Sequence, residues 1–410
     1  MRPVSYFRFP WTLADRRPYL ELPFPLHEYQ RRVDALRREM VKAELDAMIL
    51  VGDVRERGHV RWLTNFYALL GETMVVVPRE GELTLVTSAA AHGEPMHSFV
   101  HDTWVPDMRC ALFHDLPSDP PTVPGVVVDV LKEKKLASAR IGVAGWRLLG
   151  YDSFNALRTA VPDVRWSDAT RACELAKAVK SDLEILVIEQ AQASVDAGFL
   201  AALKAAVPGA TELEVCAELE GGMRRTGMQT VANLFDTRVC SGYRAALKNG
   251  NPTMKRLMKG EPIFLDISAT YQGYTVDCAI GTVVGGDPTP EQENFFETAS
   301  RMSEAILAAA KSGTPAPNLV EVARQVAREM GEEKWFLEYI SGHGIGSSEL
   351  EIPRINPNSP DVLADNMVFS IEPMVVDPVR GTGCTEYMCV ITPEGGRRLS
   401  RLPTRPWKQM

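Results

Sequence analysis

Residues 261–284 read EPIFLDISATYQGYTVDCAIGTVV. Two runs rich in apolar and β-branched residues flank a turn centred on Tyr271-Gln-Gly273, a pattern that is typical of an antiparallel hairpin. Asp266 and Asp277 lie equally far from the centre of this turn. Because residues equidistant from a turn face one another across the pair, we expect both carboxylates on one face. Two anions so close among apolar neighbours repel and lose hydration, and a bound cation is the simplest compensation.

A second stretch has the same arrangement. Residues 370–392 read SIEPMVVDPVRGTGCTEYMCVIT, and Glu372 and Glu386 are symmetric about a turn at 377–381. The alternative for either hairpin alone is a pair of solvated carboxylates on the wet face of a sheet. Two hairpins with the same geometry favour a buried site over that alternative.

One histidine lies between the two hairpins, in the stretch SGHGIGSSELEIP at 341–353. His343 is the only histidine after residue 114, so a metal site in this half must be mostly carboxylate, which suits Mn, Fe, Co or Zn with oxygen ligands. Such a site can hold two ions with bridging carboxylates and lower the pKa of a bound water. The predicted ligands are Asp266, Asp277, His343, Glu372 and Glu386.

The patterns along the chain predict two domains, at 1–178 and 179–410. Strands alternating with helices up to about residue 170 predict an α/β layer domain, including a helix at 28–47 and strands at 47–52 and 140–146. In the second domain, Ser181 and Glu184 form a capping box that begins a helix at 181–207. The order helix, helix, hairpin then occurs twice, which suggests an internal duplication. The remaining predicted helices and strands lie at 71–78, 81–88, 148–161, 211–226, 262–284, 290–311, 317–330 and 368–391, with a glycine loop at 342–346.

Composition limits the class of protein. The chain has 410 residues and a formal net charge of −8, which disfavours a general nucleic-acid or anionic-membrane binder. We find no apolar run of about 18 residues and no signal peptide, and we therefore expect a cytoplasmic protein without a membrane partner. The seven cysteines are odd in number and include no CxxC pair, which suits a reducing compartment.

The order D-x10-D, GHGIG, IEP and a final Glu resembles the "pita-bread" family of methionine aminopeptidase, aminopeptidase P, prolidase and creatinase. Residues 178–199 resemble the first helix of that catalytic domain, and residues 28–66 resemble the start of the N-terminal domain of the creatinase and prolidase branch. The resemblance implies a pita-bread catalytic domain with pseudo-two-fold symmetry after a creatinase-type α/β domain. It also implies two divalent ions, Glu372 as proton shuttle, and a homodimer whose partner edges the active site.

The chain departs from this family at positions near the substrate. The peptidases carry a histidine where Leu350 stands and another where Asn249 stands, and Cys278-Ala279-Ile280 replaces the usual xTR after the second Asp. In the family those histidines hydrogen-bond the scissile amide and help stabilise the tetrahedral intermediate, as oxyanion donors do elsewhere. Leucine cannot donate, whereas asparagine can. These departures favour a specialised member acting on an unusual small substrate.

Several residues are candidates to take over the roles of the two missing histidines. Glu349 and Asn249 are candidate catalytic residues. The candidate substrate-binding residues are Leu350, His59, Lys248, Tyr243 and Glu351. The alternatives are charged loop residues at the pocket edge for Glu349 and Glu351, a solvated Lys248, and a structural role for His59. Trp62, Tyr67, Arg244 and Trp335 are further possible pocket residues, although aromatic residues belong more often to a core.

Three functions remain open on the sequence. The first is a metal-dependent hydrolase that cleaves a C–N bond of a small amide, amidine or dipeptide-like substrate. The second is a metal-dependent lyase on a small carboxylate, similar to the dimethylsulfoniopropionate-lyase branch, which would release an alkene instead of an amine. The third is a non-catalytic binding module, which the retention of all five predicted ligands disfavours.

Overall fold

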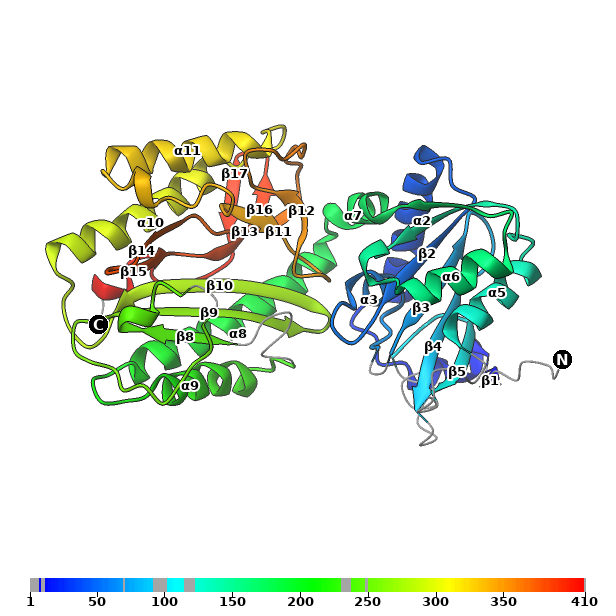
Figure 1. Ribbon diagram of the computed structural model, residues 1–410, viewed down its shortest axis with the longest axis horizontal. Coiled ribbons are helices and arrows are strands. Elements are labelled where there is room, and N and C mark those ends of the chain that lie inside the picture. The colour runs from blue at the N-terminus through cyan, green and yellow to red at the C-terminus, as the bar shows by residue number, and fades with distance from the viewer. Residues whose placement is uncertain are drawn as a thin grey trace. The chain divides into compact units, whose positions relative to one another are not determined.

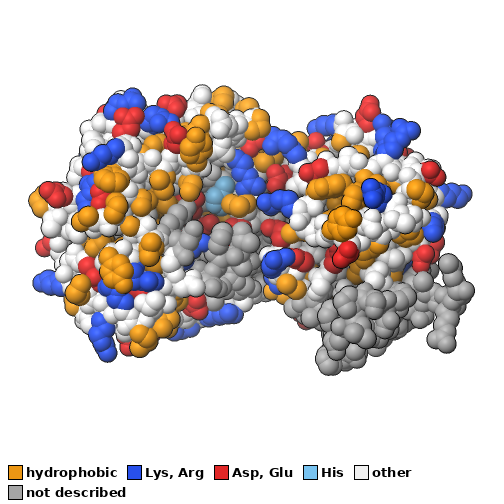
Figure 2. Space-filling model, in the orientation of Figure 1, with side chains coloured by type: hydrophobic (Ala, Val, Ile, Leu, Met, Phe, Trp, Pro, Cys, Tyr) orange, Lys and Arg blue, Asp and Glu red, His pale blue; other side chains and the backbone are white. Residues whose placement is uncertain are grey.

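The computed structural model describes residues 7–8, 12–68, 71–90, 102–113, 122–229, 237–247 and 250–408 (Figure 1). The chain divides into two compact units, Met1–Lys177 and Ala178–Met410. The predicted division at 178/179 lies one residue from this boundary. On the face drawn in Figure 2, acidic and basic side chains are interspersed, so that face carries no single-sign surface.

The first unit is built on a seven-stranded mixed sheet with the order β1-β5-β4-β3-β2-β6-β7. Its strands are β1 (Phe7–Arg8), β2 (Ala47–Gly52), β3 (Thr73–Pro78), β4 (Thr84–Ala90), β5 (Asp107–Phe113), β6 (Arg140–Ala144) and β7 (Arg165–Asp168). Its α-helices are α1 (Leu13–Arg16), α2 (Leu26–Lys42), α3 (Gly58–Thr64), α5 (Val123–Glu133), α6 (Tyr151–Ala160) and α7 (Thr170–Ala178).

Helices cover both faces of this sheet (Figure 1). Along β2, Met48 and Leu50 pack with α2 and α3, whereas Ala47 and Ile49 pack with α5. A strand buried on both faces reads as a continuous apolar run, as 47–52 does. The predicted α/β layer domain is confirmed. Helices α1, α3, α5 and α7 and strands β1, β5 and β7 were not predicted.

The second unit contains two helix pairs and two main sheets. The helices are α8 (Asp182–Ala205), α9 (Glu212–Arg225), α10 (Pro290–Ala309) and α11 (Ala316–Glu329). One sheet has the order β10-β9-β8, with β8 (Arg238–Ser241), β9 (Pro262–Tyr271) and β10 (Tyr274–Val283). The other has the order β12-β11-β13-β16-β17, and β14 pairs with β15. These strands are β11 (Gly342–Gly344), β12 (Glu351–Arg354), β13 (Val368–Ile371), β14 (Met374–Asp377), β15 (Gly381–Cys384), β16 (Tyr387–Thr392) and β17 (Gly395–Arg398).

Helix α8 begins as predicted, because Ser181 and Glu184 form the reciprocal capping box. It is the one helix in the described part of the chain that is long and apolar enough to span a membrane. Of its most apolar window, 61% is buried inside the protein, which is the burial of a core helix. In Figure 1 it lies along the β8–β10 sheet together with α9.

The first hairpin forms, but its register differs from the predicted one. The turn consists of Gln272 and Gly273, with φ values of 46° and 87°, as two-residue hairpin turns require. Asp277 therefore pairs with Ser268, and Asp266 pairs with Ala279. The prediction that Asp266 and Asp277 are directly opposed is wrong. The shift is two residues along one strand, which keeps both side chains on one face as diagonal neighbours.

The second hairpin has the predicted symmetry. Ile371 pairs with Tyr387 and Met374 pairs with Cys384, so Glu372 and Glu386 fall at equivalent positions between two paired segments. The backbone N–H of Glu386 donates to the Ala279 carbonyl at 2.8 Å, which joins this hairpin to β10. This junction brings the two hairpins together at their acidic residues.

The predicted glycine loop at 342–346 is in part a strand. Residues Gly342–Gly344 form β11, which pairs with β12 on one side and β13 on the other. A Cβ atom at Gly344 would lie 2.1 Å from the Ile352 carbonyl oxygen, and one at Gly342, where φ is 145°, would lie 2.3 Å from that of Ser370. The glycines therefore allow three strands to pack closely and hold the backbone of His343 in a fixed place.

Candidate metal centre

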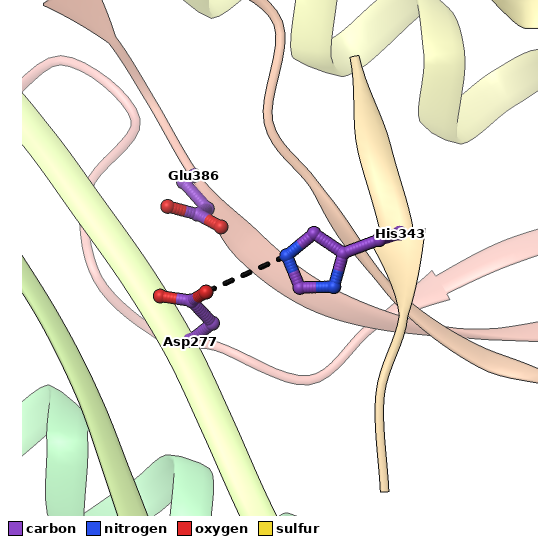
Figure 3. Close-up of side chains that lie close together, drawn as sticks. All are labelled: Asp277, His343 and Glu386. Carbon is purple, nitrogen blue, oxygen red and sulfur yellow. Dashed lines mark ion pairs between the residues drawn. The ribbon is translucent and has the colours of Figure 1, made fainter. Parts of the chain in front are cut away.

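Three predicted ligands converge from separate strands. Asp277 comes from β10, His343 from β11, and Glu386 from the residue before β16 (Figure 3). Each offers a ligand atom, and these atoms lie within 4.8 Å of one another. The His343 Nε2 atom is 3.5 Å from Asp277 Oδ2, and all three residues are buried.

The orientation of His343 is set by its own backbone neighbour. Its Nδ1 atom lies 3.1 Å from the Gly344 carbonyl oxygen, so Nδ1–H donates there and Nε2 is the atom that faces the carboxylates. Glu372 Oε2 is 3.9 Å from Nε2. An imidazole lone pair facing two carboxylates is stable only with a cation between them, either a proton or a metal ion. Among the protein charges alone, burial lowers the pKa of His343, but Asp277 and Glu372 raise it overall.

The carboxylates are crowded enough to need that cation. Burial is the largest cause that raises the pKa of Glu386 well above its ordinary value, followed by Asp277 and Glu372. Burial and Asp277 likewise raise the pKa of Asp266 to about 7. The Ser370 hydroxyl donates to Glu386 Oε1 at 2.7 Å and holds that side chain in place. Several buried oxygen ligands and one aimed imidazole nitrogen fit a divalent ion of the Mn, Fe, Co or Zn type.

A residue that sequence reasoning missed also belongs to this region. Arg238 of β8 lies directly opposite Asp266, and its Nη1 atom contacts Asp266 Oδ2. Burial lowers the pKa of this guanidinium, but Asp266, Asp277 and Glu349 raise it above its ordinary value. Although burial and Asp277 raise the pKa of Asp266, the Arg238 guanidinium lowers it, so the contact favours the ionised carboxylate. No spacing motif marks Arg238, because it approaches Asp266 only through strand pairing.

Comparison with known proteins agrees with this geometry. Residues 187–393 match the sequence profile of metallopeptidase family M24, and residues 32–179 match the creatinase/prolidase N-terminal domain. The chain belongs to metallopeptidase family M24. The predicted family, the fold class and the assignment as a metallopeptidase-type enzyme are thereby confirmed.

Relatives in the M24 family include dipeptidases. The chain is 34% identical to an Xaa-Pro dipeptidase of Pyrococcus horikoshii over 223 residues, which are 54% of this chain and 62% of that protein. An X-Pro aminopeptidase structure from Thermotoga maritima matches with a TM-score of 0.77 at 25% identity, covering 91% of this chain and 98% of that one. The dipeptidase PepE from Mycobacterium ulcerans matches with a TM-score of 0.79 at 25% identity, covering 93% and 98%.

Within this M24 fold, Glu349 and Glu351 are both buried, at 3% and 0% exposure, so neither is a solvated surface charge. Glu349 accepts a hydrogen bond from the Ser268 hydroxyl at 2.8 Å, which places it beside the strand that carries Asp266. Glu351 forms a buried ion pair with Lys180 at 2.9 Å and accepts from the Ser348 N–H. Glu351 thus anchors the segment after His343, a placement that does not favour a substrate contact.

The structure gives three different outcomes for the other predicted substrate-binding residues. Leu350 is 39% exposed and Tyr243, in the 3-10 turn Gly242–Arg244, is 77% exposed, so both are available to a ligand. His59 is buried in α3, with Nδ1 3.6 Å from the Cys173 sulfur, which supports the alternative of a structural histidine. Lys248 and Asn249 lie outside the described residues.

Cys278, one of the departures from the family pattern, and Tyr387, the residue after Glu386, both pack in the protein interior. Cys278 accepts a hydrogen bond from Gln192 Nε2 at 3.2 Å inside the core. Tyr387 is 1% exposed, and its ring lies 4.3 Å from the Arg398 guanidinium carbon. The further aromatic candidates Trp62 and Trp335 pack in the hydrophobic cores of their own units.

Proposed function

We propose that this M24 protein is a metal-dependent hydrolase that cleaves a C–N bond of a small amide or dipeptide-like substrate. The observation that carries the proposal is the buried convergence of Asp277, His343 and Glu386 on three strands. The names of its relatives, which include Xaa-Pro dipeptidases, support a dipeptide-like substrate, although the match spans 62% of the first relative's length. A homodimer is a further part of this proposal, and it rests on the family resemblance.

Different residues of the protein would bind the metal ion and transfer the proton. A divalent ion, when bound, polarises a water molecule and the substrate carbonyl. Asp277, His343 and Glu386 would hold that ion. Glu372, whose Oε2 lies 3.9 Å from His343 Nε2, would take the proton from the attacking water and deliver it to the leaving nitrogen.

Leu350 points to a specialised substrate. A leucine side chain donates no hydrogen bond, so it cannot stabilise a developing oxyanion as a histidine there would. Its 39% exposure makes it an apolar contact surface. A substrate with an apolar group at that position and a donor supplied by another residue would fit this chain best.

The decisive experiment combines a ligand variant with product analysis. Asp277→Asn should abolish stoichiometric metal binding and turnover, because it removes one anionic ligand from the buried trio. Asp287→Asn, a substitution at an exposed position in the same unit, should leave both unchanged. A panel of dipeptides and small amides, with released amine measured by mass spectrometry, would identify the substrate class. Full turnover by Asp277→Asn would sink the proposal, and an alkene product would replace it with the lyase.

A further inference from the structure

One arginine lies against the carboxylates of the metal centre. Arg238 begins β8, and its partner across the antiparallel pair is Asp266. Directly opposed residues share a face of the sheet, so the guanidinium extends toward the same side as the carboxylate. Nη1 contacts Asp266 Oδ2, and the two side chains are only 9% and 7% exposed. A protein cation therefore already occupies one oxygen of Asp266.

Asp266 is also set apart from the three ligands that converge. In the portion of the chain that the structure describes, the group of ligand atoms within 4.8 Å consists of Asp277, His343 and Glu386, without Asp266. The hairpin register explains this separation. Asp266 and Asp277 are diagonal neighbours, and diagonal pairs lie about 7–8 Å apart, farther than directly opposed residues.

The electrostatics of Arg238 oppose a second metal ion. An arginine keeps its charge at every pH a protein tolerates, so it cannot yield Asp266 by losing a proton. A divalent ion on Asp266 would meet this fixed positive charge at contact distance in a buried site with weak screening. Glu349, which is 3% exposed and held by Ser268, adds an anion close enough to raise the guanidinium pKa, which holds the arginine in the centre.

We propose that Arg238 takes the place of a second metal ion at Asp266, and that this protein holds one divalent ion on Asp277, His343 and Glu386 with Glu372 beside it. The inference rests on the metal-dependent function proposed above, but it concerns the number of ions. It differs from the sequence-based expectation of five ligands for two ions. Asp266 then becomes the partner that positions Arg238.

The test counts ions independently of activity. Full-length protein is equilibrated with Mn²⁺, freed of excess metal and measured by elemental mass spectrometry, with calorimetric titration in parallel. The wild-type chain should bind one ion, and Arg238→Met should bind two, because it removes the guanidinium from Asp266 Oδ2. Arg380→Met is the matched control, since it removes an arginine from the partly buried pair with Glu332 in the same unit. Its ion count should stay at one.

Asp266→Asn keeps the inference falsifiable if Arg238→Met does not fold. This variant should still bind one ion, with an affinity within about tenfold of the wild type, since Asp266 is a neighbour of the site and not a ligand. Two ions in the wild-type chain, or loss of the ion in Asp266→Asn, would overturn the inference. Two bound ions with normal turnover would leave the proposed function standing. One bound ion without turnover would refute only the function, and a wild-type chain that binds no Mn²⁺ would overturn both.

Discussion

The buried ion pair between Lys180 and Glu351 is expected to stabilise the segment that follows His343. Both side chains are 1% exposed, and their charged atoms are 2.9 Å apart. Lys180→Met would leave the buried Glu351 carboxylate without this lysine, beside the Ser347 hydroxyl and the Ser348 N–H that donate to it. Removing one partner of a buried pair typically costs about 3–5 kcal/mol, because the remaining charge stays uncompensated.

The double variant separates charge from packing. Glu351→Gln keeps an oxygen that can accept from Ser348 and removes the unpaired charge. We expect Lys180→Met with Glu351→Gln to lose only about 1–2 kcal/mol, so the double variant should be roughly 2–3 kcal/mol more stable than Lys180→Met alone. Lys180→Met should also weaken metal binding about 10–100-fold, because the anchored segment holds His343 in place.

Hydrogen exchange of the β9 and β10 amides is the suitable assay, since a chain of two units need not unfold in one transition. Arg225→Met is the control, because the Arg225–Glu218 pair in the same unit is exposed at 66% and 54% and should contribute less than about 1 kcal/mol. An unfolding free energy for Lys180→Met that matches the Arg225→Met value would refute the reasoning.

Three other perturbations test separate parts of the structure. Glu372→Gln should retain the metal ion but lower kcat about 10²–10⁴-fold, as loss of a proton shuttle does; an unchanged kcat would exclude this role. Burial raises the pKa of Glu72 to about 7 from 4.5, despite a hydrogen bond from Ser153. The folded first unit therefore binds a proton that the unfolded chain releases between these two pKa values. Its stability should fall by about 1–3 kcal/mol as pH rises from about 4.5 to above 7. Urea unfolding at pH 5.5 and 8 should show that loss in the wild type and not in Glu72→Gln. Gly344→Ala should destabilise the second unit by at least about 1–3 kcal/mol, because its Cβ would meet the Ile352 carbonyl; an unaltered melting temperature would contradict the close packing of β11.

Much of the metal centre could be predicted because its signals are local. The spacing of Asp266 and Asp277 fixes their common face, since the side-chain period of a strand is two. The equivalent positions of Glu372 and Glu386 in the second hairpin could be predicted for the same reason. His343 was a candidate ligand because this half of the chain has no other histidine. The error in the first register arose because the two-residue turn is centred between Gln272 and Gly273, one residue beyond the midpoint between Asp266 and Asp277.

Residues joined by long-range packing could not be assigned in this way. Lys180 and Glu351 are 171 positions apart, and either alone reads as an ordinary surface charge. His59 meets Cys173 over 114 positions, which explains why a histidine with no local motif was a poor candidate for the site. Arg238 lies 28 positions before Asp266 and becomes important only because β8 pairs with β9 in one register.

The amino-acid sequence by itself indicated the family and predicted two domains and five candidate metal ligands, because strand periodicity and short spacings are properties of neighbouring residues. Only the tertiary structure decided which of those residues converge and which are neutralised by the protein. Burial and distance set the strength of each charge, and both depend on segments that meet only after folding. Thus the sequence contains Asp266 among five equivalent candidates, whereas the folded chain pairs it with Arg238 and leaves Asp277, His343 and Glu386 to face one another.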